Sequence, residues 1–196
     1  MAQLHSMQMP QMSGVELVLR SRISALKMCL FYAVPLSIVP PAMIYYAGIM
    51  YGGDLLPSLT TMQLAAIGGV FFAVEIAMTF LMAYIIQQLG SVIDIAPKYE
   101  DAYKLAVVVP TPLWLAPLFL FIPSFVVNIT AGAVALMLSG ILIFYSVPAI
   151  FKIEEEGHSI LLAASILAAG MVGWVAMMLL TLVTWSFVSS SLLLMI

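Results

Sequence analysis

The sequence predicts an all-α, polytopic membrane protein with five transmembrane helices, a cytoplasmic N-terminus and a C-terminus outside. Three observations predict this class. Hydrophobic residues make up 64% of the 196-residue chain and charged residues 8%, whereas soluble domains carry about 25% charged residues. Several uncharged stretches are long enough to cross a bilayer, and the basic residues group on alternate loops. This composition excludes a soluble enzyme, a nucleic-acid-binding protein and a disordered chain.

Five stretches meet the requirement of about 20 mainly apolar residues for each membrane-crossing helix. Their ranges are 28–50, 64–89, 105–123, 129–151 and 159–187. The third and fourth share one uncharged run, 105–151, which is too long for a single crossing at about 1.5 Å per residue. Pro123, Ser124 and Asn128 are typical of a turn and divide this run in two.

The remaining N-terminal residues, 1–27, are predicted to form a cytoplasmic segment ahead of the transmembrane domain, 28–196. Apolar residues recur among charged ones over 13–27, a pattern typical of an amphipathic helix at the membrane surface. The charges of this segment keep it in water or at the edge of the bilayer.

Basic residues set the orientation of the five predicted spans. All of them fall on one side of the membrane: Arg20, Arg22, Lys27, Lys98, Lys104 and Lys152. Loops rich in Lys and Arg stay on the cytoplasmic side, so the N-terminus is expected in the cytoplasm. An odd number of crossings then places the C-terminus outside.

Glu75 is the charged residue that falls near the middle of a predicted span. An ionised side chain costs at least about 2.5–3.5 kcal/mol at that depth, so the carboxyl group is expected to take up a proton or to face a polar partner or cavity. Two interpretations stay open. One is a site for a proton, a cation or a bound polar group, and the other is a protonated side chain that hydrogen-bonds to a neighbouring helix as part of packing.

The third span contains Pro110, Pro112 and Pro117 and is therefore not expected to be a regular helix. Carbonyl groups that proline frees at membrane depth need partners inside the protein, which favours a central position for this span. These three prolines are candidates for a cavity or hinge.

A short surface helix is predicted to lead into the third span from the polar stretch 90–104. Two tyrosines spaced four apart lie on one face of it, because residues i and i+4 are neighbours on a helix. Tyr99 and Tyr103, together with Lys104, are the candidate interaction surface on the cytoplasmic side.

Neither a metal site, a cofactor site nor catalysis is predicted. Glu155 and His158 have the i, i+3 spacing of di-metal bundles, but a second such pair is missing from the sequence, and a solvated turn is the better interpretation. The methionines over residues 7–12 follow His5. Thioethers suit monovalent copper, yet such a site is weak without further ligands.

Two segments carry a resemblance to a known family. Residues 103–113, Tyr-Lys-Leu-Ala-Val-Val-Val-Pro-Thr-Pro-Leu, lead from a polar loop into a proline-rich span, and Tyr145-Ser146-Val147-Pro148 precedes the charged turn 152–157. With five spans behind a polar N-terminus, the chain resembles the Yip-one (Ypt/Rab-interacting protein) domain family over about residues 28–187. Its short form is similar to bacterial inner-membrane members. The resemblance implies an integral protein of the bacterial inner membrane; vesicle traffic is implied for the eukaryotic branch.

Two alternative functions therefore follow from the sequence. The first is a non-enzymatic, membrane-organising scaffold that binds lipids or partners and contacts the lipid bilayer, other membrane proteins or a second copy of the chain. The second is a small transporter or channel subunit that uses Glu75 and the proline-broken third span around a central cavity. The surroundings of Glu75 discriminate between them.

Overall fold

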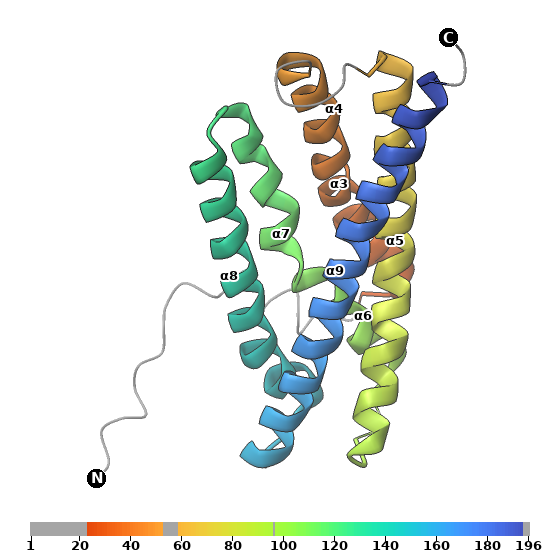
Figure 1. Cartoon of the computed structure of the whole chain (residues 1–196). Coiled ribbons are helices and arrows are strands. Elements are labelled where there is room, and N and C mark those ends of the chain that lie inside the picture. The colour runs from red at the N-terminus through yellow and green to blue at the C-terminus, as the bar shows by residue number, and fades with distance from the viewer. Residues whose placement is uncertain (1–22, 53–58, 96, 194–196) are drawn as a thin grey trace.

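The computed structural model describes residues 23–52, 59–95 and 97–193, and side chains up to Val188. Within these residues all regular structure is helical, and five helices are long and apolar enough to cross a membrane. They are Ala25–Tyr51, Thr61–Val92, Tyr99–Phe121, Phe125–Phe151 and Glu156–Val188. The expected all-α fold with five membrane-crossing helices is therefore confirmed, and the helices form an elongated bundle (Figure 1).

The first span is irregular because prolines interrupt it. It consists of α2 (Ala25–Met28), the π-helix η1 (Cys29–Ala33), α3 (Val34–Ser37) and α4 (Val39–Tyr51). Pro35 and Pro40 lack an amide proton and crowd the preceding turn, which accounts for the π-helical turn before Pro35 and the interruption at Ile38. Residues 13–22 of the predicted surface helix lie outside the described residues, and Ala25 already belongs to the first span.

Helices α5 (Thr61–Val92) and α9 (Glu156–Leu193) are long and pack against each other (Figure 1). A capping box begins α5: the Thr60 hydroxyl accepts from the Gln63 amide at 3.3 Å, and the Gln63 side chain accepts from the Thr60 amide at 2.9 Å. Gln63 Nε2 also donates to the Val188 carbonyl at 3.3 Å. These contacts fix the start of α5 and join it to α9.

The third span is broken near its middle. It consists of α6 (Tyr99–Val108), α7 (Thr111–Leu115) and the 3₁₀-helix η2 (Ala116–Phe121). Val109 and Pro110 form the turn between α6 and α7. The Thr111 hydroxyl donates to the Val108 carbonyl at 2.7 Å, so a carbonyl group at the break has a partner inside the protein.

A tight turn joins the third span to α8 (Phe125–Phe151). The Ser124 hydroxyl caps α8 by accepting from the Val127 amide at 3.4 Å. The Asn128 side-chain amide donates to the carbonyls of Ile122 at 3.0 Å and Ser124 at 2.8 Å. These bonds satisfy the backbone of the turn and let α8 return antiparallel to α7 (Figure 1).

Candidate functional site

A cavity of about 410 Å³ lies between the spans, and each of the five contributes to its lining. The lining includes one or more residues from each span, for example Pro40 of α4, Glu75 of α5, Trp114 of α7, Ser139 of α8 and Trp174 of α9. Most of the other lining side chains are apolar. The volume falls within the range of about 300–1,000 Å³ that is typical of small-molecule pockets.

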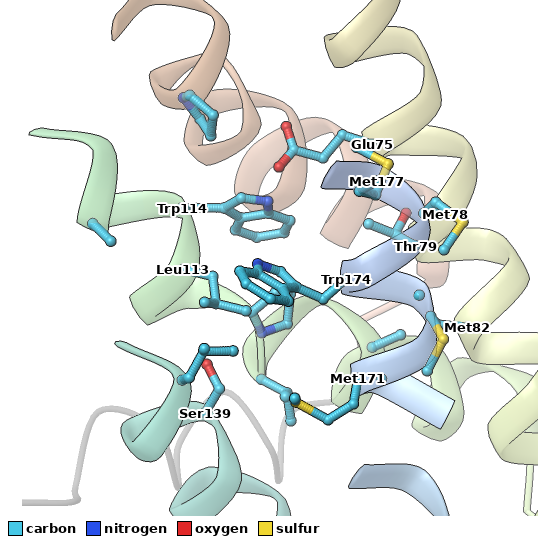
Figure 2. A pocket seen from close by; sticks show the side chains of 18 of the residues that line it. Glu75, Met78, Thr79, Met82, Leu113, Trp114, Ser139, Met171, Trp174 and Met177 are labelled. Atoms are coloured by element: carbon cyan, nitrogen blue, oxygen red, sulfur yellow. The ribbon is translucent and has the colours of Figure 1, made fainter. Parts of the chain in front are cut away.

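Glu75 lies near the middle of α5, and its carboxyl group borders the cavity (Figure 2). Its Oε2 atom is buried and has no hydrogen-bond partner among the described residues. The ring nitrogen of Trp114 points toward this carboxyl group (Figure 2). Thr79, one turn further along α5, donates instead to the Ile76 carbonyl at 2.7 Å. One carboxyl oxygen of Glu75 is therefore still available to a further donor.

The break in the third span helps to make the cavity. Pro110 and Pro117 line it together with Glu75, whereas Pro112 is not among its lining residues. Pro112 lies in the first turn of α7, where its missing amide proton has no intrahelical partner to lose. The structure thus brings two of the three candidate prolines to the same cavity as the candidate carboxyl group.

Trp114, Trp174 and Ser139 were not predicted from the sequence as site residues, although all three line the cavity (Figure 2). Tryptophans of membrane proteins gather at the membrane–water interface. Trp174 lies near the centre of α9 instead, and this unusual position could have indicated an internal site. Ser139 is 5% exposed, and among the described residues its Oγ atom has no partner. In the sequence its four-residue spacing with Ala131 and Ala135 indicates helix packing rather than a site.

The structure buries two of the three residues of the expected interaction surface, Tyr103 and Lys104. Tyr103 is 0% exposed and Lys104 5% exposed, while Tyr99 is half-buried. Lys104 Nζ pairs with Asp101 Oδ1 at 3.0 Å. The physical reason is that the helix enters the bundle from Tyr99 onward and packs on α5, so its tyrosine face turns inward. Tyr103 and Lys104 are interior residues, not a surface.

The charged turn before α9 holds an exposed pair in which His158 Nδ1 lies 2.7 Å from Glu155 Oε2. Among the described residues, no three His, Cys, Asp or Glu side chains come together as a metal site would require. His5 and the methionines over residues 7–12 lie outside the described residues. This turn therefore offers one solvated pair rather than a coordination sphere.

The five long apolar helices define an integral membrane protein, and a mainly apolar cavity lies between them. Residues 15–177 match the family model of the Yip1 domain, and the chain therefore belongs to the Yip1 domain family, as the sequence resemblance implied. This is a family of membrane proteins that is not known as enzymatic. No curated protein and no solved structure is similar enough to be matched to the chain.

Proposed function

We propose that this Yip1-domain protein is a non-enzymatic scaffold of the bacterial inner membrane that binds a lipid chain in its cavity. The observation that carries the proposal is the cavity itself, because all five spans line it mainly with apolar side chains. An apolar lining favours hydrocarbon over water. Binding at the junction of five spans would hold them in one arrangement and couple the bundle to the surrounding lipid.

The positions of the basic residues support a cytoplasmic N-terminus. Lys27 lies at the start of the first span, Lys98 directly before the third and Lys152 directly after the fourth. Because successive spans alternate in direction, these three positions lie at the same end of the bundle. Lysines near span ends favour the cytoplasmic side.

The outer face of the bundle supports contact with lipid and with membrane partners or a second copy of the chain. In the most apolar window of the fifth span, 11% of the residues are buried inside the bundle. The rest of that window is open to lipid tails or to a neighbouring helix. A scaffold needs such a surface in addition to an internal site.

A second function, that of a small transporter or channel subunit, is favoured by one specific observation. Glu75 lines the cavity together with Pro110 at the helix break, and one of its carboxyl oxygens is buried without a partner among the described residues. Intramembrane carboxyl groups next to interrupted helices are typical of transport sites. Flux measurements on reconstituted vesicles separate the two functions, because transport requires Glu75-dependent flux and a scaffold shows none.

The proposed lipid site is tested by filling the cavity. Gly170 lines the cavity, and a Cβ atom placed there meets nothing within 4 Å, so the first carbon of the side chain that Gly170→Leu adds has room. We expect the lipid that co-purifies in polymer-extracted nanodiscs to fall about tenfold, corresponding to ~1.4 kcal/mol. Native mass spectrometry of the extracted protein measures the amount of bound lipid.

Gly69 provides the matched control for this substitution. It also lies on a membrane-spanning helix, a Cβ atom there also meets nothing within 4 Å, and it does not line the cavity. Gly69→Leu is expected to retain lipid like the unchanged protein. Equal retention by Gly170→Leu, or no bound lipid in the unchanged protein, contradicts the proposal.

A further inference from the structure

Two residues that line the cavity carry a buried oxygen atom that no described group satisfies. Glu75 Oε2 comes from α5, and Ser139 Oγ comes from α8. Ser139 is 5% exposed and lines the cavity. In the view of Figure 2 the two residues lie toward opposite ends of the space. Buried polar atoms are almost always paired in folded proteins, so the carboxyl group of Glu75 favours an occupant that carries a polar group at its end of the cavity.

The charge of that polar group follows from the surroundings of Glu75. The described basic side chains do not supply its counter-charge, because Lys104 is paired with Asp101 at 3.0 Å and the others lie at span ends. Those others are Lys27, Lys98 and Lys152. An ionised carboxyl group at membrane depth requires a partner of opposite charge, and a cation beside Glu75 favours its ionised form. An occupant with a positive charge fills this role.

The aromatic lining also favours a cation. The indole rings of Trp114 and Trp174 both border the cavity, and Figure 2 shows them between Glu75 and Ser139. The face of an indole ring attracts ammonium groups, and the attraction grows when water is excluded. Methionines such as Met78 and Met177 supply a deformable apolar wall beside them.

We propose that the cavity binds an organic cation, in which an ammonium group on an apolar body lies against Glu75 and the two indole rings. The assignment rests on the proposed use of the cavity as a ligand site and adds the class of ligand. The carboxylate supplies charge, the tryptophans supply ring faces, and the apolar walls take the body of the ligand. The ammonium group belongs to a lipid headgroup or to a free amphipathic cation.

Two probes of equal shape test the proposal with the full chain in phosphatidylglycerol nanodiscs. Benzyltrimethylammonium carries the charge, and neopentylbenzene replaces its nitrogen with carbon. Equilibrium binding of each radiolabelled probe is measured after subtraction of binding to empty nanodiscs. We expect the cation to bind about tenfold or more tightly than the neutral probe. Equal affinities overturn the inference.

Glu75→Gln keeps the shape of the side chain and removes its charge. We expect it to lower the affinity for benzyltrimethylammonium about tenfold and to leave neopentylbenzene unchanged, which also reports an intact cavity. Glu154→Gln, in the exposed turn, is the matched control and is expected to leave both affinities unchanged. Unchanged cation binding by Glu75→Gln overturns the inference.

Trp174 offers a second test if Glu75→Gln fails to fold. Trp174→Phe is expected to retain more cation affinity than Trp174→Leu, because a phenyl ring keeps an aromatic face. An equal loss of cation affinity in Trp174→Phe and Trp174→Leu overturns the inference. If phosphatidylethanolamine in the nanodiscs competes with benzyltrimethylammonium, the ammonium group belongs to a lipid headgroup. If it does not compete, the ammonium group belongs to a free cation.

The two proposals fail in different ways. If both probes bind equally and Gly170→Leu abolishes both, the cavity is a ligand site and only the cation assignment is wrong. If neither probe binds and Gly170→Leu retains lipid like the unchanged protein, the proposed function fails as well.

Discussion

Tyr103 on α6 donates its hydroxyl hydrogen to Thr79 on α5, with 3.2 Å between the two oxygen atoms. The direction is fixed because the Thr79 hydroxyl, which has one hydrogen, already donates to the Ile76 carbonyl at 2.7 Å. Phe80 lies against the Tyr103 ring with centroids 4.9 Å apart. One buried side chain therefore joins the second and third spans through a polar and an aromatic contact.

Tyr103→Phe is expected to lower the free energy of unfolding by about 1 kcal/mol, since it removes one buried hydrogen bond and keeps the ring. Thermal unfolding in detergent, followed by circular dichroism, measures the change. Tyr84 is 55% exposed, so Tyr84→Phe is the control and is expected to stay within about 0.5 kcal/mol of the unchanged protein. A midpoint for Tyr103→Phe equal to that of the control contradicts the role of this bond.

Thr111→Val is expected to destabilise the protein more than Tyr32→Phe. The two hydroxyl groups lie 2.8 Å apart, and the Thr111 hydroxyl also donates to the Val108 carbonyl at 2.7 Å. Loss of Thr111 leaves that carbonyl without this donor, at a cost of about 1–3 kcal/mol, whereas loss of the Tyr32 hydroxyl costs about 1 kcal/mol.

A double-mutant cycle in the same unfolding assay measures the coupling of Tyr32 and Thr111. The expected coupling is about 1 kcal/mol. Strictly additive effects of the two substitutions would show that the hydrogen bond does not join the first and third spans.

Gly90→Ala is expected to destabilise the end of α5. A Cβ atom at Gly90 would collide with the Pro97 ring and lie 3.2 Å from the Ile95 carbonyl oxygen, and overpacking of this kind costs about 1–3 kcal/mol. Gly69→Ala is the control, because nothing lies within 4 Å of a Cβ atom there. That control is expected to gain up to about 1 kcal/mol from helix propensity. The reverse order of the two midpoints would contradict the packing described here.

Ser139→Ala is expected to raise the free energy of unfolding by about 0.5–1 kcal/mol without ligand. It removes a buried hydroxyl group that has no partner among the described residues, and alanine is the better helix former. Ser165 is the control, because its hydroxyl is bonded to the Leu161 carbonyl at 2.8 Å. A lower midpoint for Ser139→Ala would mean that the hydroxyl group is satisfied.

The number of spans could be predicted from the sequence because each depends on local composition. A stretch of about 20 residues without charge favours a membrane helix wherever it occurs. The break in the third span was equally local, since Pro110 has no amide proton to continue α6. Glu75 was found for the same reason, because an isolated carboxyl group stands out in an apolar span.

The burial of Tyr103 and Lys104 could not be predicted, because it depends on which helix lies opposite. Charges around them are typical of a surface loop, and only the packing of α6 on α5 turns them inward. The same holds for Trp174 and Ser139, which come from separate spans and meet at the cavity. Their convergence is a property of tertiary packing that local patterns do not contain.

The two interrupted spans lie next to each other, and this has a mechanical consequence. The first span bends around η1 and Ile38, the third around Pro110, and Tyr32 joins them. Helices α5, α8 and α9 are each continuous. The cavity is therefore lined by three continuous helices and by two spans that are interrupted near their middle. A change in the bend of either interrupted span would open or narrow the cavity to an occupant while α5, α8 and α9 stay continuous.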